Sequence, residues 1–153
     1  MHVTSAIAWF GALIFFISVL GPAVRTFTPA ASLEFLVKVG PRQLRFFAGT
    51  ATATIIFGLA LLFTSLGTDY TLWPTTIVAG FVLGLLAYLV ALVVAIPAFR
   101  KADAIAKEFS KNPAGPPPPD LAKYLNRGRI GAASVLVILL LTTVFMVATG
   151  FPF

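Results

Sequence analysis

The sequence has few of the residues on which most catalytic and metal sites depend. It contains no cysteine, one histidine and two methionines among its 153 residues. Without cysteine the chain forms no disulfide, offers no thiol nucleophile and ligates no iron–sulfur cluster. His2 is therefore the only strong nitrogen ligand among the side chains on which a metal or redox site can be built.

Charged residues are also scarce. They make up 10% of the chain, against 59% hydrophobic residues, whereas a water-soluble domain carries roughly 25% charged residues. No ionisable side chain lies deep inside the long apolar runs, and Arg45 comes nearest to doing so. Because such a group within the membrane usually marks a proton relay or an ion path, its absence argues against a proton-coupled transporter and a hydrolase. We expect a membrane protein without catalytic activity of its own.

Four long apolar runs dominate what the sequence does contain. Each has the roughly 20 residues that a helix needs to cross a bilayer. Stretches such as "ASVLVILLLTTVF" lack the alternation of a membrane β-strand, and helices satisfy their own backbone hydrogen bonds in lipid. We predict a single all-α domain, residues 1–153, folded as an antiparallel bundle of four transmembrane helices. The predicted helices cover about residues 3–24, 44–66, 75–99 and 130–149.

The basic residues give this bundle an orientation. All 11 lysines and arginines lie between the first and second runs, up to Arg45, or between the third and fourth. Because basic loops stay in the cytoplasm, residues 25–43 and 100–129 are predicted to be cytoplasmic loops, and both termini to lie outside the cell membrane. Tyr70 and Trp73 fit the outer interface, which aromatic rings favour. The cations then have membrane lipids as partners, rather than nucleic acid.

The two basic loops have patterns of their own. In the first, "AASLEFLVKV" is typical of a short amphipathic helix on the membrane surface, with Pro29 and Pro41 as turns at its ends. In the second, the third helix is predicted to continue through "RKADAIAKEF", with Asp103 and Lys107 on an exposed face. The run "PPPP" favours a stiff spacer, with a docking site for a proline-binding partner as the alternative. Asp120 is the expected N-cap of the next helix.

Small residues recur at helical spacing in three of the four predicted helices. Such stripes let transmembrane helices approach closely. They predict tight packing within a four-helix bundle, with self-association through the third helix as the alternative. The residues expected to pack in this way are Gly11, Gly49, Ala53, Gly80, Gly84, Ala87 and Ala91.

His2 is the main candidate for a cofactor-binding or metal-binding residue. It lies at the outer end of the first predicted helix, and Met146 lies near the outer end of the fourth. A histidine and a methionine together ligate haem iron, and methionine sulfur also suits Cu(I). Three interpretations stay open: a haem b or copper site at these residues, an ordinary interfacial histidine, and a contact with a partner. The threonine hydroxyls are expected to bond to their own backbone.

The N-terminal half also carries a recognisable pattern. Its elements are His2 early in the first helix, the "WFG" step from Trp9 to Gly11, Pro22 at the end of that helix, and a basic cluster, Arg42 and Arg45, that opens the second helix. This pattern resembles the copper-resistance protein D-like family and a related group of small haem-binding four-helix membrane proteins. The resemblance implies a four-helix fold and makes His2 a ligand. The haem-binding relatives place a second His or Lys ligand in a later helix, where this chain has neither, and Met146 matches no family motif.

Three functions follow from these patterns. The favoured one is a non-catalytic structural or accessory subunit of a larger membrane complex, which needs nothing that the sequence lacks. The second is a haem- or copper-binding membrane protein with its site near the outer surface at His2. The third is a small-molecule transporter, against which the lack of intramembrane charge counts. Other membrane subunits, or further copies of this chain, are the expected protein partners.

Overall fold

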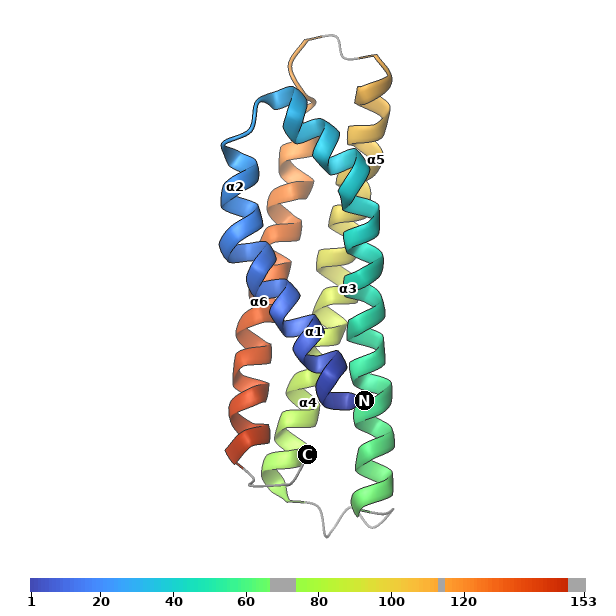
Figure 1. The fold of residues 1–153 in the computed structure, drawn as a ribbon, viewed down its shortest axis with the longest axis vertical. Helices are drawn as coiled ribbons and strands as arrows, with labels where there is room; N and C mark the ends of the chain where they lie inside the picture. Colours follow the sequence, from blue (N-terminus) through green and yellow to red (C-terminus); the bar gives the residue numbers. More distant parts are fainter. Residues whose placement is uncertain (67–73, 113–114, 149–153) are drawn as a thin grey trace.

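The computed structural model describes residues 1–66, 74–112 and 115–148, and within these ranges its regular structure is entirely helical. Four helices are long and apolar enough to cross a membrane. Figure 1 shows them side by side along the long axis of the molecule. The predicted all-α fold is confirmed for the described residues. The expectations for Tyr70 and Trp73 concern residues outside these ranges.

The four long helices are built from shorter segments joined end to end. The first contains α1 (His2–Phe15), η1 (Phe16–Leu20) and α2 (Gly21–Arg25). The second is α3 (Pro29–Leu66). The third contains α4 (Thr75–Val90), η3 (Ala91–Ala95) and α5 (Ile96–Lys111). The fourth is α6 (Pro119–Ala148).

The helices extend beyond the apolar runs that the sequence marks. The second and third each offer 37 residues, or about 55 Å at about 1.5 Å per residue, against a hydrocarbon core of about 30 Å. Their middle parts expose apolar side chains, as at Val93, which is 67% exposed, and on α6 Val144 is 64% exposed. The charged ends of these helices therefore extend beyond the hydrocarbon layer that their apolar parts can span.

Two helices contain a π-helical turn just before a proline. These turns, η1 and η3, end two residues before Pro22 and Pro97 respectively. A proline lacks the N–H of a normal helical bond, and its ring clashes with the carbonyl four residues earlier. A wider turn accommodates the ring without ending the helix. Both helices thus stay continuous through a residue that normally interrupts them.

The prediction of a separate short helix in the first basic loop is wrong. Residues 29–66 form one helix, α3, with Pro41 inside it rather than at a turn. Figure 1 shows the first part of α3 inclined to the remainder, as expected for a proline kink. The inclined part does not present its apolar side chains to lipid, since Leu33 and Leu36 pack against a buried cluster of α5 and α6. That cluster consists of Ala102, Ala106 and Leu121.

Close packing between α4, η3 and α6 forms the centre of the bundle. Ala87 is fully buried and Ala91 is 8% exposed. A Cβ at Gly131 of α6 would stand 3.1 Å from the backbone nitrogen of Ala95, so the two helices meet almost backbone to backbone there. Gly84 also faces α6, because a Cβ at this glycine would stand 3.7 Å from the methyl carbon of Thr142. The predicted small-residue contact of the third helix is found here.

The small residues of the first two helices behave differently. No atom lies within 4 Å of the Cβ position at Gly11 or Gly49. Both glycines face outward, and the internal packing predicted for them is not found. Ala53 of α3 is half-buried. Asp120 is also placed differently, because α6 begins at Pro119 and Asp120 lies in its first turn rather than at the N-cap.

Candidate functional site

The imidazole of His2 lies between α1 and α3. His2 is the first residue of α1, and its Nδ1 is 3.0 Å from the backbone carbonyl oxygen of Thr54 on α3. A carbonyl oxygen only accepts hydrogen bonds, so Nδ1 is the donor. In the neutral ring, the lone pair is then on Nε2. The contact between α1 and α3 therefore fixes both the ring and its tautomer.

A glycine on α3 makes room for this ring. A Cβ at Gly58 would stand 3.0 Å from both Cε1 and Nδ1 of His2. Gly58 lies one helical turn after Thr54, so the two residues form one small surface beneath the imidazole. The Thr54 side chain takes no part, because its hydroxyl donates to the Thr50 carbonyl at 2.8 Å. The backbone of α3, rather than its side chains, holds His2.

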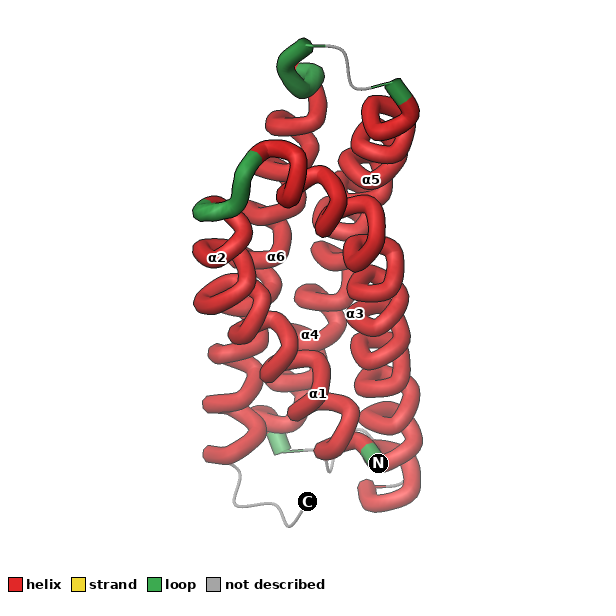
Figure 2. Tube along the Cα trace, turned by 45° about the horizontal axis from the view of Figure 1, so that its top comes forward, coloured by secondary structure: helices red, strands yellow, loops and turns green. Residues whose placement is uncertain are grey.

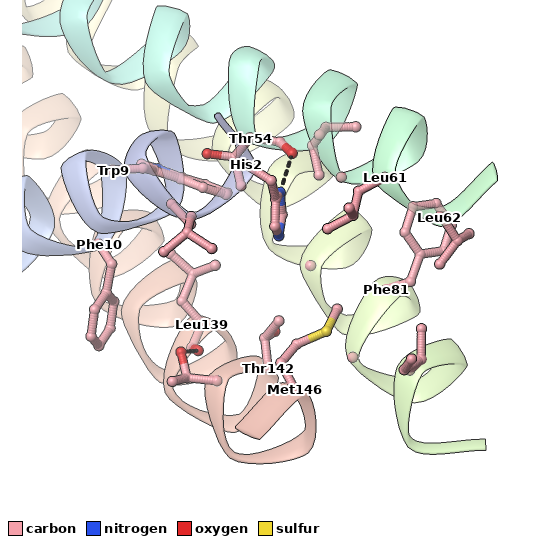
Figure 3. Close-up of a pocket in the computed structure, with 18 of the residues that line it drawn as sticks. His2, Trp9, Phe10, Thr54, Leu61, Leu62, Phe81, Leu139, Thr142 and Met146 are labelled. Carbon is pink, nitrogen blue, oxygen red and sulfur yellow. Dashed lines mark hydrogen bonds between the residues drawn. The ribbon is translucent and has the colours of Figure 1, made fainter. Parts of the chain in front are cut away.

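Met146 lies on the other side of the same space. Its side chain crosses Gly80 of α4, where a Cβ would stand 3.0 Å from its Cε and 3.2 Å from its Sδ. His2 and Met146 both line a pocket of about 330 Å³ between α1, α3, α4 and α6. Figure 3 shows the two side chains entering this pocket from opposite walls. The structure therefore brings together the two candidate ligands that the sequence indicates.

The rest of the pocket wall is almost entirely apolar. Trp9, which is 2% exposed, packs inside the bundle and forms part of this wall. The hydroxyls of Thr142 and Thr143 donate to carbonyls of their own helix. Among the described residues that line the pocket, His2 is the one with an ionisable side chain. The volume of the pocket is near the lower end of the range for small-molecule sites, which is about 300 to 1,000 Å³.

The expectation for the threonine hydroxyls is confirmed at most positions. Those of Thr50, Thr54, Thr64, Thr142 and Thr143 donate to carbonyls three or four residues earlier. Thr52 is the exception, because its hydroxyl is 3.0 Å from the hydroxyl of Tyr88 on α4.

The donor set at this site is small. No group of three or more His, Cys, Asp or Glu side chains that could hold a metal ion occurs within residues 1–66, 74–112 and 115–148. Among the described residues that line the pocket, His2 supplies an imidazole nitrogen and Met146 a thioether sulfur as candidate ligands. Such a pair suits haem iron or Cu(I) rather than the hard cations, which prefer oxygen.

Two contacts of the site escape prediction from sequence. The carbonyl of Thr54 is a backbone group that every residue carries, and nothing in the sequence singles it out. Gly58 has a weak signal, since a glycine inside a helix costs about 1 kcal/mol relative to alanine. An otherwise unexplained glycine in an apolar helix therefore points to a close approach by another group.

Comparison with known protein families, with characterised proteins and with solved structures finds no match to this chain. The resemblance to the copper-resistance protein D-like family accordingly stays a prediction.

Proposed function

We propose that this chain is an integral membrane protein that holds haem b or a copper ion in the His2 pocket. The observation that supports the proposal is the hydrogen bond from Nδ1 of His2 to the Thr54 carbonyl. Histidines that ligate metals commonly donate their second ring N–H to a carbonyl or carboxylate, which fixes the ring and leaves the other nitrogen for the metal. His2 makes the same hydrogen bond through Nδ1, so Nε2 would be the ligating atom.

The pocket fits such a group in the chemistry of its walls. His2 would supply a nitrogen ligand and Met146 a sulfur ligand. The apolar wall, including Trp9, would exclude water and cover the flat face of a porphyrin or a low-coordinate Cu(I) ion. Either group would supply one-electron redox chemistry, or in the case of copper, metal binding alone.

The orientation in the membrane belongs to the same proposal. The distribution of basic residues favours an antiparallel bundle in the cell membrane with both termini outside. The His2 pocket would then be close to the outer surface. It would be reached from outside the cell, or by a partner in the outer leaflet.

The test is to purify the full chain in mild detergent and measure its metal content and its reduced-minus-oxidised absorption spectrum. His2→Ala removes the nitrogen ligand, and Thr142→Val is the matched control, because it changes the same wall but removes a hydroxyl that bonds only within α6. Haem bands or stoichiometric copper in the wild type and control, and their loss in His2→Ala, are expected. Equal loading of His2→Ala, or no haem and no copper in the wild type, would overturn the proposal.

A second candidate is the structural subunit of a larger membrane complex. It is favoured by Gly11 and Gly49, whose outward faces are open within this chain and suit close approach by another transmembrane helix. Leucine at either position is expected to reduce the native mass of the assembly. Leucine at the outward Val93, which offers no small-residue face, is the control. An unchanged native mass in Gly11→Leu and Gly49→Leu would count against this candidate. The transporter hypothesis gains no support from the pocket.

A further inference from the structure

A second pocket, unconnected with the His2 site, lies at the basic end of the bundle. It has a volume of about 300 Å³ and is bordered by α2, α3, α5 and α6. Figure 2 shows this end, with α2 and α6 on one side and α3 and α5 on the other. Three charged side chains line the pocket: Arg25 from α2, Asp103 from α5 and Arg129 from α6.

Asp103 is the most unusual of these residues. It is only 6% exposed, and no hydrogen bond or ion pair to it occurs among residues 1–66, 74–112 and 115–148. Its carboxyl group lies against the backbone of α3, because a Cβ at Gly40 would stand 2.5 Å from Oδ1. The sequence predicts that Asp103 and Lys107 share an exposed face; Lys107 is exposed, but the prediction is wrong for Asp103. A buried carboxylate without a donor leaves strong acceptor capacity unused.

The two arginines form no ion pair within the described residues. The ion pairs of the described residues join Lys38 to Glu34 and Lys111 to Glu108, and neither involves Arg25 or Arg129. Two guanidinium groups at one pocket repel each other and together favour an anion. Guanidinium donors match the geometry of a phosphate particularly well.

The remaining wall of the pocket is mostly hydrocarbon, and among the described residues Ser32 and Gln43 of α3 are its uncharged polar side chains. It includes the rings of Phe16, Phe47 and Phe99, and the side chains of Leu20, Leu36 and Leu125. The pocket lies at the level where the apolar runs give way to charged residues, since Arg25 ends the first helix and Arg129 directly precedes the apolar part of α6. This is the depth at which lipid phosphates stand.

We propose that this pocket binds one phosphatidylethanolamine-type lipid. The phosphate would lie between Arg25 and Arg129, and the primary ammonium group would donate hydrogen bonds to Asp103. An acyl chain would pack along the phenylalanine and leucine wall. Such a lipid would match three features of the pocket: the two arginines, the unpaired carboxylate and the apolar wall beside them.

The buried position of Asp103 also predicts selectivity among headgroups. A trimethylammonium headgroup has no N–H to donate and is bulkier, and the carboxyl group lies against the α3 backbone at Gly40. A glycerol headgroup carries hydroxyls but no cation to pair with Asp103. A hydrogen bond between charged groups contributes enough to change affinity by about tenfold. We expect at least that preference for the ethanolamine lipid over the choline and glycerol lipids.

The test is native mass spectrometry of the delipidated full chain, titrated separately with phosphatidylethanolamine, phosphatidylcholine and phosphatidylglycerol of identical acyl chains. Asp103→Asn is expected to remove the preference for the ethanolamine lipid, while Arg129→Gln should weaken all three lipids alike. The matched controls are Glu108→Gln, an exposed acid on the same helix, and Arg127→Gln, an exposed base near Arg129. Neither should change the preference.

Several outcomes would overturn the proposal. Equal affinity of the wild type for the ethanolamine and choline lipids would do so even if Asp103→Asn failed to fold. If the folded Asp103→Asn variant still prefers the ethanolamine lipid, the carboxylate is not the group that recognises the headgroup. Tighter binding of the glycerol lipid would show that the pocket selects net negative charge. Competition by soluble phosphoethanolamine as strong as by the lipid would exclude the acyl chain as part of the ligand.

Discussion

Replacing Gly58 by alanine tests whether the backbone of α3 holds the His2 imidazole. The new methyl group would stand 3.0 Å from Cε1 and Nδ1 of the ring, whereas comfortable contacts between heavy atoms lie near 3.5 to 4.0 Å. The ring has to withdraw by a few tenths of an ångström or more. Its hydrogen bond to the Thr54 carbonyl, now 3.0 Å long, would then stretch toward the limit of a real hydrogen bond.

The cost in stability is expected to be small. Losing the hydrogen bond costs about 0.5 to 1.5 kcal/mol, while alanine in place of a helical glycine contributes up to about 1 kcal/mol. The two effects largely cancel, so the thermal unfolding midpoint should move by only a few degrees. A local change at His2 can therefore be measured in a protein that remains folded.

The assay is nitrogen NMR of protein labelled at histidine, which is unambiguous because the chain has a single histidine. The wild type should show one neutral tautomer with the proton on Nδ1, and Gly58→Ala should show a mixture of tautomers. Gly11→Ala is the matched control, since no atom lies within 4 Å of its Cβ position. A wild-type spectrum with the proton on Nε2, or an unchanged spectrum in Gly58→Ala, would refute the reasoning.

Other substitutions test the packing and the topology. Gly131→Leu should destabilise the fold by about 3 kcal/mol or more, measured by thermal unfolding in detergent, because the backbone at Ala95 cannot withdraw from the new side chain. Gly84→Leu should cost less, about 1 to 3 kcal/mol, since it has open pocket beside it; no loss in either variant would contradict the close helix contact. A cysteine introduced at Ser110 should resist an impermeant thiol reagent in intact cells, and one at Thr68 should react; the reverse labelling would invert the orientation.

The four long helices are predictable because hydropathy is a local property of the chain. Each apolar run is long enough by itself to require a helix in lipid. The ends of the helices are harder to predict, because they depend on packing elsewhere. The pattern of residues 29–43 predicts a separate surface helix, yet Leu33 and Leu36 pack on α5 and α6 and keep α3 continuous through Pro41.

The candidate site is predictable only in part, for a related reason. The shared depth of His2 and Met146 follows from alternating helices, and the pocket joins them as that depth suggests. His2 packs against Gly58 and Met146 packs against Gly80. Both are contacts between different helices, and the periodicity of a sequence does not show which helices meet. Asp103 shows the opposite error, because a charge pair spaced by four residues is typical of a solvated face. Its burial depends on Gly40, a residue on another helix.

The two pockets are related through α3. Gly40 faces Asp103 and Gly58 faces His2, and these glycines are 18 residues apart, from 58 minus 40. Eighteen residues make five turns of an α-helix, about 27 Å at about 1.5 Å per residue, and return to the same face. This separation is close to the roughly 30 Å of a hydrocarbon core. The same helix, α3, therefore supplies the glycine against which each of two ionisable side chains packs, the carboxyl group of Asp103 and the imidazole of His2.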